Sequence, residues 1–255
     1  MTPGARIAAA IEILEKVERS GSPAEDVVSS YIRGRRYIGS KDRRAITSRV
    51  FAILRRQARL DWQSGSKEAR TRVITDLSLS EGTSTQAFSD LFNGVGYAAQ
   101  PLSNDEKSLL RRLKDKSFEN TNYPLHIQSE LPDWITKKLL VHWGDDFMIE
   151  SQALNQPGSL DLRINTLKGD CTRALQVLQK DQIEANPTAF SPLGLRVKGR
   201  INLQASTAFK GGFIEIQDEG SQLVAALVAT KADMKTIDLC AGGGGKTLAL
   251  SAAMK

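Results

Sequence analysis

Four consecutive glycines near the C-terminus of the chain constrain its fold more than any other feature. They are residues 242–245, and they stand between an apolar tetrapeptide at 236–239 and an apolar run at 247–254. Glycine lets the backbone turn sharply without a Cβ in the way, and the amides that open a helix point toward a bound ligand. A short strand, a glycine loop and a helix in this order are typical of the nucleotide-binding corner of an α/β domain.

The spacing of the glycines narrows the type of nucleotide. A phosphate-binding P-loop would be completed by Gly245, Lys246 and Thr247, but its first glycine falls on position 240, which is Cys240. A dinucleotide fingerprint, Gly-x-Gly-x-x-Gly, would place its last glycine on a residue other than glycine. Asp238 at the end of the strand and an open glycine loop instead favour an amino-acid-bearing nucleoside such as S-adenosylmethionine. A tight strand-to-helix turn without a ligand is the alternative.

Residues 238–247, Asp-Leu-Cys-Ala-Gly-Gly-Gly-Gly-Lys-Thr, resemble the cofactor motif Asp-x-Cys-Ala-x-Pro-Gly-Gly-Lys-Thr of the NOP/Sun family of RNA cytosine-C5 methyltransferases. Gly243 stands where the family most often has proline. Residues 162–168 resemble the family's Arg-x-Asn-x-x-Lys strand, and residues 216–222 resemble its Gln-Asp-x-x-Ser segment. The order of the three motifs is most similar to the RsmB/Sun-type bacterial enzymes, which act on small-subunit (16S) ribosomal RNA and carry a NusB-like helical domain in front.

This resemblance implies an enzyme that transfers a methyl group from S-adenosylmethionine to cytosine C5 of RNA, with 16S ribosomal RNA as the expected substrate. It assigns the cofactor contacts to Cys240, Ala241, Gly242, Gly243, Gly244, Gly245 and Lys246.

In the family a cysteine thiolate adds to cytosine C6, because C5 is otherwise a poor nucleophile. The family supplies that thiolate from a Pro-Cys and a Thr-Cys motif downstream of the cofactor loop, and neither motif occurs in this sequence. The resemblance therefore implies no catalytic residue within the chain, and we interpret Cys240 and Cys171 as structural. We expect the front part of a methyltransferase that is inactive alone. The segment after about residue 236 should be loosely held or depend on contacts with earlier residues.

Positive charge is concentrated in one segment. Residues 31–59 hold ten basic residues and one acidic residue, a local charge of +9 in a chain whose net charge is +6. On a helix that starts at Asp42, apolar side chains fall on one face and arginines on the other. A dense arginine face suits contact with phosphate oxygens. The sequence thus predicts RNA contacts by Arg44, Arg55, Arg56 and Arg59, on a single helix that ends near Trp62.

Helical spacing of apolar residues predicts an all-helical N-terminal block. Apolar residues recur at helical intervals over 7–17 and 27–32, and Ser103 and Glu106 form the ends of a capping box. Ser64 begins a polar connector between the arginine-rich helix and the later helices.

After Pro132 the pattern changes to strands that alternate with helices. Strands are predicted at 160–167, 194–197 and 213–217, and helices at 134–143 and 172–182. The expected fold class is multi-domain, α and α/β. The expected domains are a helical NusB-like RNA-binding domain at 1–130, a small α/β subdomain of the methyltransferase at 131–212, and the start of a Rossmann-like S-adenosylmethionine-binding domain at 213–255.

Composition is that of a globular chain. Of its 255 residues, 40% are hydrophobic and 25% charged, with no apolar run of membrane-spanning length. The N-terminus lacks a signal-peptide core, so we expect a cytoplasmic protein. Two cysteines and two histidines give neither a disulfide framework nor a metal-ligand cluster, so no metal is expected. We expect a monomer.

Two other functions fit part of the sequence. A non-catalytic RNA-binding or antitermination-type module would explain the helical block, but it would not need the strand and glycine loop at 236–247. A P-loop NTPase is disfavoured by Cys240 and by the lack of a Walker-type acidic strand.

Overall fold

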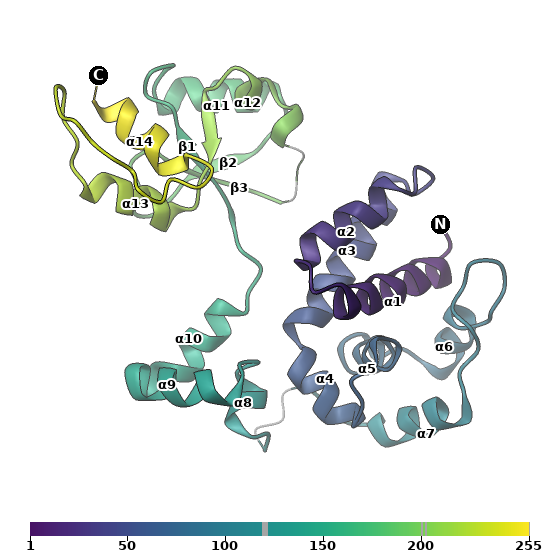
Figure 1. Cartoon of the computed structure of the whole chain (residues 1–255). Helices are drawn as coiled ribbons and strands as arrows, with labels where there is room; N and C mark the ends of the chain where they lie inside the picture. The colour runs from purple at the N-terminus through teal and green to yellow at the C-terminus, as the bar shows by residue number, and fades with distance from the viewer. Residues whose placement is uncertain (119–121, 200, 202, 255) are drawn as a thin grey trace. The chain divides into compact units, whose positions relative to one another are not determined.

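The computed structural model describes residues 1–118, 122–199, 201 and 203–254, and it divides into two compact units, Met1–Gln156 and Pro157–Lys255 (Figure 1). Each unit has its own cluster of buried apolar side chains. None of the described helices combines the length and apolar character needed to cross a membrane.

The first unit is helical throughout its described residues. Its helices are α1 (Pro3–Ser20), α2 (Ala24–Arg33), α3 (Ser40–Arg55), α4 (Gln57–Ser64), α5 (Ala69–Glu81), α6 (Thr85–Leu91), α7 (Asn104–Leu113), α8 (Leu125–Gln128), α9 (Asp133–Trp143), the 3₁₀ turn η1 (Gly144–Asp146) and α10 (Phe147–Leu154).

Local signals explain where several of these helices begin. Thr2 caps α1 by accepting a hydrogen bond from the Ala5 amide, and Pro3 opens the helix. The capping box of α7 is confirmed, because the Ser103 hydroxyl accepts from the Glu106 amide and the Glu106 carboxylate accepts from the Ser103 amide. The periodic apolar residues of α1 are buried on one side of the helix, as predicted.

The arginine-rich segment forms two helices rather than one. The prediction of a single helix was wrong at Arg56, whose φ of −118° and ψ of 18° end α3 and precede α4. The break reorients the chain, so the side chains of Arg56 and Arg59 do not continue the face on which Arg44 lies. A helical projection from sequence assumes unbroken geometry and cannot show such a break.

The polar connector is short, and a buried helix follows it. Only residues 65–68 separate α4 from α5. Arg72 and Asp76 of α5 are buried to 3% exposure each, and Thr75 is fully buried. These polar side chains hide the helix from a search for apolar periodicity. They are buried because partners far away in the sequence satisfy them: Arg72 donates to Asp61 and to Glu18.

The second unit holds a four-stranded sheet. Its elements are β1 (Leu160–Ile164), α11 (Cys171–Lys180), β2 (Ala185–Pro187), β3 (Gly194–Val197), the 3₁₀ turn η2 (Leu203–Ala205), α12 (Thr207–Lys210), β4 (Ile214–Ile216), α13 (Glu219–Leu227) and α14 (Gly245–Ala253). The strand order is β2-β3-β1-β4, and each neighbouring pair is antiparallel.

Alternation along β1 gives the sheet an apolar face and a polar face. Leu162 and Ile164 belong to the core of this unit together with Leu178 of α11. Asp161 and Arg163 point to the opposite face, and they are also buried, at 2% and 3% exposure. Helix α13 contacts β1, so polar groups are enclosed beneath it.

The predicted strand at 236–239 is not formed. These residues have no strand pairing in the structure, and Ile237 and Leu239 are 88% and 90% exposed. The reason is that a strand is stable only when its backbone groups pair with another strand, and no described strand lies beside this segment. The predicted helix beyond the glycines is confirmed as α14, which packs against α13.

Candidate cofactor and RNA sites

The glycine loop connects residues 236–239 to the start of α14. Gly244 is the N-cap residue of α14, with φ of +80°, and Gly242 has φ of +55°. Both lie in the left-handed region that favours glycine. Asp238 and Thr247 link the two ends of the loop, because the Thr247 hydroxyl donates to the Asp238 carboxylate at 2.8 Å. The loop is therefore a closed turn with a helix N-terminus at its end.

All seven sequence-predicted cofactor residues lie on this turn. A Cβ added at Gly242, Gly243 or Gly244 would meet no atom within 4 Å. The loop backbone is thus open on the side where a ligand could approach. Cys240 is an exposed free thiol, and Lys246 is exposed in the first turn of α14.

Three separate motifs of the sequence meet beside this loop. The Arg163 guanidinium donates through Nε to Gln217 Oε1 at 2.8 Å. Gln217 is buried, and a Cβ added at Gly245 would lie 3.6 Å from its Nε2. Gln222 holds the backbone of this region by donating to the carbonyls of Gln217 and Leu162, at 2.9 and 3.2 Å. Side chains from β1, from the end of β4 and from α13 thus support the start of α14.

Charged groups complete this buried network. Arg196 of β3 makes a two-pronged contact with Asp161, with N···O distances of 2.7 and 2.8 Å. These hydrogen bonds hold the pKa of the Asp161 carboxyl below its usual range. Glu219 accepts from the amides of Phe190 and Ser191, which lowers its pKa too.

The sequence prediction missed this network. Asp161 alternates with Leu160 and Leu162, and that pattern is the same for a polar residue facing solvent as for one beneath a helix. Nothing local to Arg196 or Glu219 indicates that they contact the same buried region. The only available signal was the pair of motifs at 162–168 and 216–222.

The arginines proposed for RNA contact lie along α3 and α4. Arg44 is exposed on α3, and Arg55 ends that helix. Arg56 donates to Ser80 Oγ at 2.6 Å and to Asp76 at 3.2 Å. Arg59 donates through Nε to Glu130 at 2.7 Å. The charge that looked unopposed in sequence therefore has carboxylate partners, supplied by α5 and by the turn after α8.

Both of those carboxylates are buried. Asp76 and Glu130 have side chains that are 5% and 6% exposed, and burial raises the pKa of each. Glu130 also accepts from the amides of Ala58 and Arg59, at 2.7 and 3.2 Å. The start of α4 is thus fixed to the chain that follows α8.

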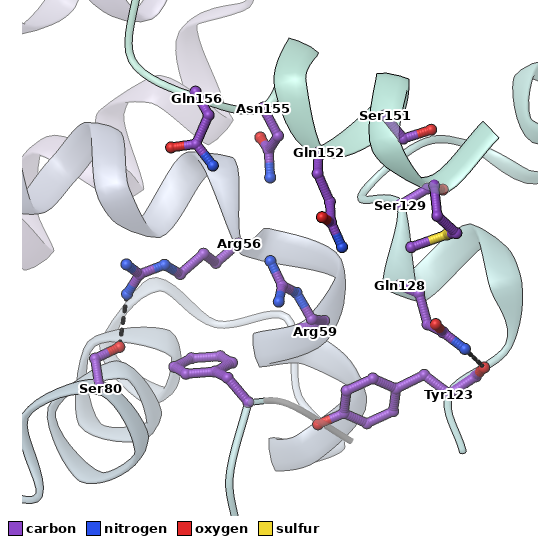
Figure 2. A pocket seen from close by; sticks show the side chains of 12 residues that line it. Arg56, Arg59, Ser80, Tyr123, Gln128, Ser129, Ser151, Gln152, Asn155 and Gln156 are labelled. Carbon is purple, nitrogen blue, oxygen red and sulfur yellow. Dashed lines mark hydrogen bonds between the residues drawn. The ribbon is translucent and has the colours of Figure 1, made fainter. Parts of the chain in front are cut away.

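Arg56 and Arg59 line a cavity of about 630 Å³ within the first unit, which we call the α4–α10 cavity (Figure 2). Ser80 of α5, Tyr123 before α8 and Gln152 of α10 also line it. Asn155 fastens one side, because its amide donates to the Arg55 carbonyl at 2.8 Å.

Comparison with known proteins agrees with the class that the sheet and loop define. Residues 131–204 match the family described as Methyltr_RsmF/B-like, ferredoxin-like domain. The fold is shared with the crystal structure of PH0851, with a TM-score of 0.69 at 22% identity over 100% of this chain and 62% of that one.

Curated relatives name the family more closely. "Probable ribosomal RNA small subunit methyltransferase B" of Synechocystis sp. is 26% identical over 92% of this chain and 58% of its own length. "Ribosomal RNA small subunit methyltransferase B" of Xylella fastidiosa is 30% identical over 45% of this chain and 27% of its own length. The chain belongs to this RsmF/B-like methyltransferase family, which confirms the resemblance seen in its motifs. It spans little more than half the length of the longer-matching relative.

Proposed function

We propose that this chain is part of an S-adenosylmethionine-dependent RNA cytosine-C5 methyltransferase whose substrate is small-subunit ribosomal RNA. The observation that carries the proposal is the meeting of Arg163, Gln217 and Gly245, one from each motif, beside an open glycine loop. A chain that needed only a turn at 240–246 would not require a buried polar network to support it. The names of the relatives support the substrate class.

The loop fits an amino-acid-bearing nucleoside. The first amides of α14 can donate to a carboxylate, and the exposed Lys246 adds positive charge at the same place. The residues proposed to hold the cofactor are those from Cys240 to Lys246, and Asp238 holds the loop through Thr247. S-adenosylmethionine would supply the activated methyl group.

The remaining residues have supporting roles in this proposal. Residues 1–130 would bind RNA as a NusB-like domain, residues 131–212 would form the small α/β subdomain, and residues 213–255 would begin the Rossmann-like domain. Cys240 and Cys171 are proposed to be structural. Because the sequence lacks both a Pro-Cys and a Thr-Cys pair, we expect the 255 residues alone to transfer no methyl group.

The test is calorimetric titration of the full-length gene product with S-adenosylhomocysteine and, separately, with ATP. We expect binding of S-adenosylhomocysteine and none of ATP. Thr247→Val removes the hydroxyl that donates to Asp238 and should weaken binding, whereas Thr247→Ser keeps that hydroxyl and should not. Tight ATP binding without S-adenosylhomocysteine binding would favour an NTPase instead. Methyl transfer to ribosomal RNA by the 255 residues, lost in Cys240→Ser, would show that the loop cysteine is the nucleophile.

A further inference from the structure

The α4–α10 cavity has a size and shape suited to one planar polar ligand. Its volume of about 630 Å³ lies within the ~300–1,000 Å³ typical of small-molecule sites. Its walls come from α3, α4, the end of α5, the chain at 118–128, and α10. The cavity lies entirely within the first unit.

The two guanidinium groups at the cavity are held in fixed positions. Arg56 is tied to Ser80 and Asp76, and Arg59 to Glu130. Figure 2 shows both side chains extending toward the cavity. Because a carboxylate offsets each positive charge, attraction to a phosphate alone does not account for this arrangement. A fixed planar guanidinium also offers a flat face for stacking on a nucleic-acid base.

An aromatic ring lies against both guanidinium groups. The Phe118 ring centroid is 5.5 Å from the guanidinium carbon of Arg56 and 5.7 Å from that of Arg59. Phe118 is half-buried and lines the cavity. Tyr123, whose hydroxyl accepts from Gln63, lines it too. Rings and guanidinium planes are the surfaces on which proteins stack unpaired RNA bases.

Amide side chains face these flat groups from α10. Gln152 and Gln156 are exposed residues that line the cavity, and Figure 2 shows them on the wall opposite Tyr123. A glutamine amide both donates and accepts hydrogen bonds, which matches the mixed edge of a nucleobase. Burying such groups against an apolar ligand would leave them without partners.

We propose that the α4–α10 cavity binds a single unstacked base of a single-stranded RNA, stacked on Phe118 and the Arg56 and Arg59 planes and hydrogen-bonded by Gln152 and Gln156. This inference rests on the proposed RNA substrate and assigns to it a base-binding site outside the cofactor loop. The phosphates on either side of the base would lie outside the cavity, within reach of exposed residues such as Arg44.

The experiment measures binding of the 255-residue chain to a short single-stranded oligoribonucleotide by fluorescence anisotropy. Two variants remove base contacts while keeping apolar volume: Phe118→Leu removes the ring, and Gln152→Leu removes an amide from an exposed helical position. Gln176→Leu makes the same change on the exposed face of α11 in the other unit and serves as the matched control. We expect Phe118→Leu to weaken binding about 5- to 150-fold, the range measured for loss of a stacked base, and the control to bind unchanged.

Further arms separate the possible outcomes. An oligoribonucleotide made abasic at every position should bind the parent chain and Phe118→Leu equally. An oligomer carrying a photoreactive uridine should crosslink within 118–123. Equal affinity of Phe118→Leu, Gln152→Leu and Gln176→Leu would overturn the inference while leaving RNA binding intact. Binding of a free nucleoside monophosphate as tight as that of the oligomer would show that the ligand is not an RNA strand. No binding of RNA by the parent chain would count against the proposed function as well.

Discussion

At the scale of single residues, the buried charges of this protein are paired across long sequence separations. Arg72 lies at 3% exposure between Asp61 and Glu18, and the Asp161 side chain is fully buried against Arg196. Such a charge is expensive to leave alone, because removing one partner strands the other in a poorly solvated site. These pairs therefore select one arrangement of helices and strands from those that the apolar pattern allows.

The Asp161 pair gives a pH-dependent prediction. Because the folded pKa of Asp161 is depressed, its contribution to stability is present above the unfolded value of about 3.9 and is lost as the pH falls through the folded pKa. Asp161→Asn should lower the melting temperature at pH 7 and flatten its dependence on pH below about 4. Thermal unfolding followed by circular dichroism across this pH range is the measurement.

A surface pair provides the control. Glu184 and Lys198 are 68% and 57% exposed, and such pairs contribute little. Glu184→Gln should leave the melting temperature at pH 7 nearly unchanged. An equal loss in both variants would mean that burial of Asp161 has no special importance.

At the scale of elements, helices whose ends carry local signals agree with prediction, and those that depend on distant partners do not. The capping box of α7 involves residues three apart, so the sequence contains all of it. Strand β3 was predicted with its observed limits, because glycine and a proline-containing turn precede its apolar run. Strand β2 is three residues long, ends in Pro187 and has no local signature.

The glycine loop allows two neighbouring positions to be compared. Gly244 has φ of +80°, whereas Gly243 has no such left-handed backbone, and neither would meet an atom if a Cβ were added. Gly244→Ala should therefore destabilise the start of α14 by about 1 kcal/mol through backbone strain, while Gly243→Ala should be neutral or slightly stabilising. Hydrogen exchange of the amides at 244–250 is the measurement. Faster exchange in Gly243→Ala than in Gly244→Ala would contradict this account of the loop.

At the scale of the whole molecule, two units with separate cores make up the chain. The larger cluster of buried apolar residues lies wholly within Met1–Gln156, and the smaller one lies within Pro157–Lys255. A unit that has its own core can fold without the other. The boundary at 156 falls within the stretch matched by the family model, 131–204. The predicted domain limits at 130 and 212 stay predictions.

We expect residues 1–156, expressed alone, to fold. The ties of Glu130 to the start of α4 and of Asn155 to the Arg55 carbonyl are retained in this fragment. Circular dichroism should show a helical spectrum and a cooperative thermal transition. A fragment with helical content but no cooperative transition would indicate that the second unit is needed for packing. The same fragment should bind the oligoribonucleotide as the full chain does, if the α4–α10 cavity is the site.

The sequence by itself determined the family, through three motifs whose residues are contiguous and therefore readable along the chain. It also determined most helices and three of the four strands, because caps, turns and periodicity act over a few residues. Only the tertiary structure decided that residues 236–239 are unpaired, since strand pairing requires a neighbour. It also placed carboxylates from distant elements beside Arg56 and Arg59, and brought Arg163, Gln217 and Gly245 together. Those contacts join residues far apart in the sequence, and no local pattern encodes which distant side chain will be the partner.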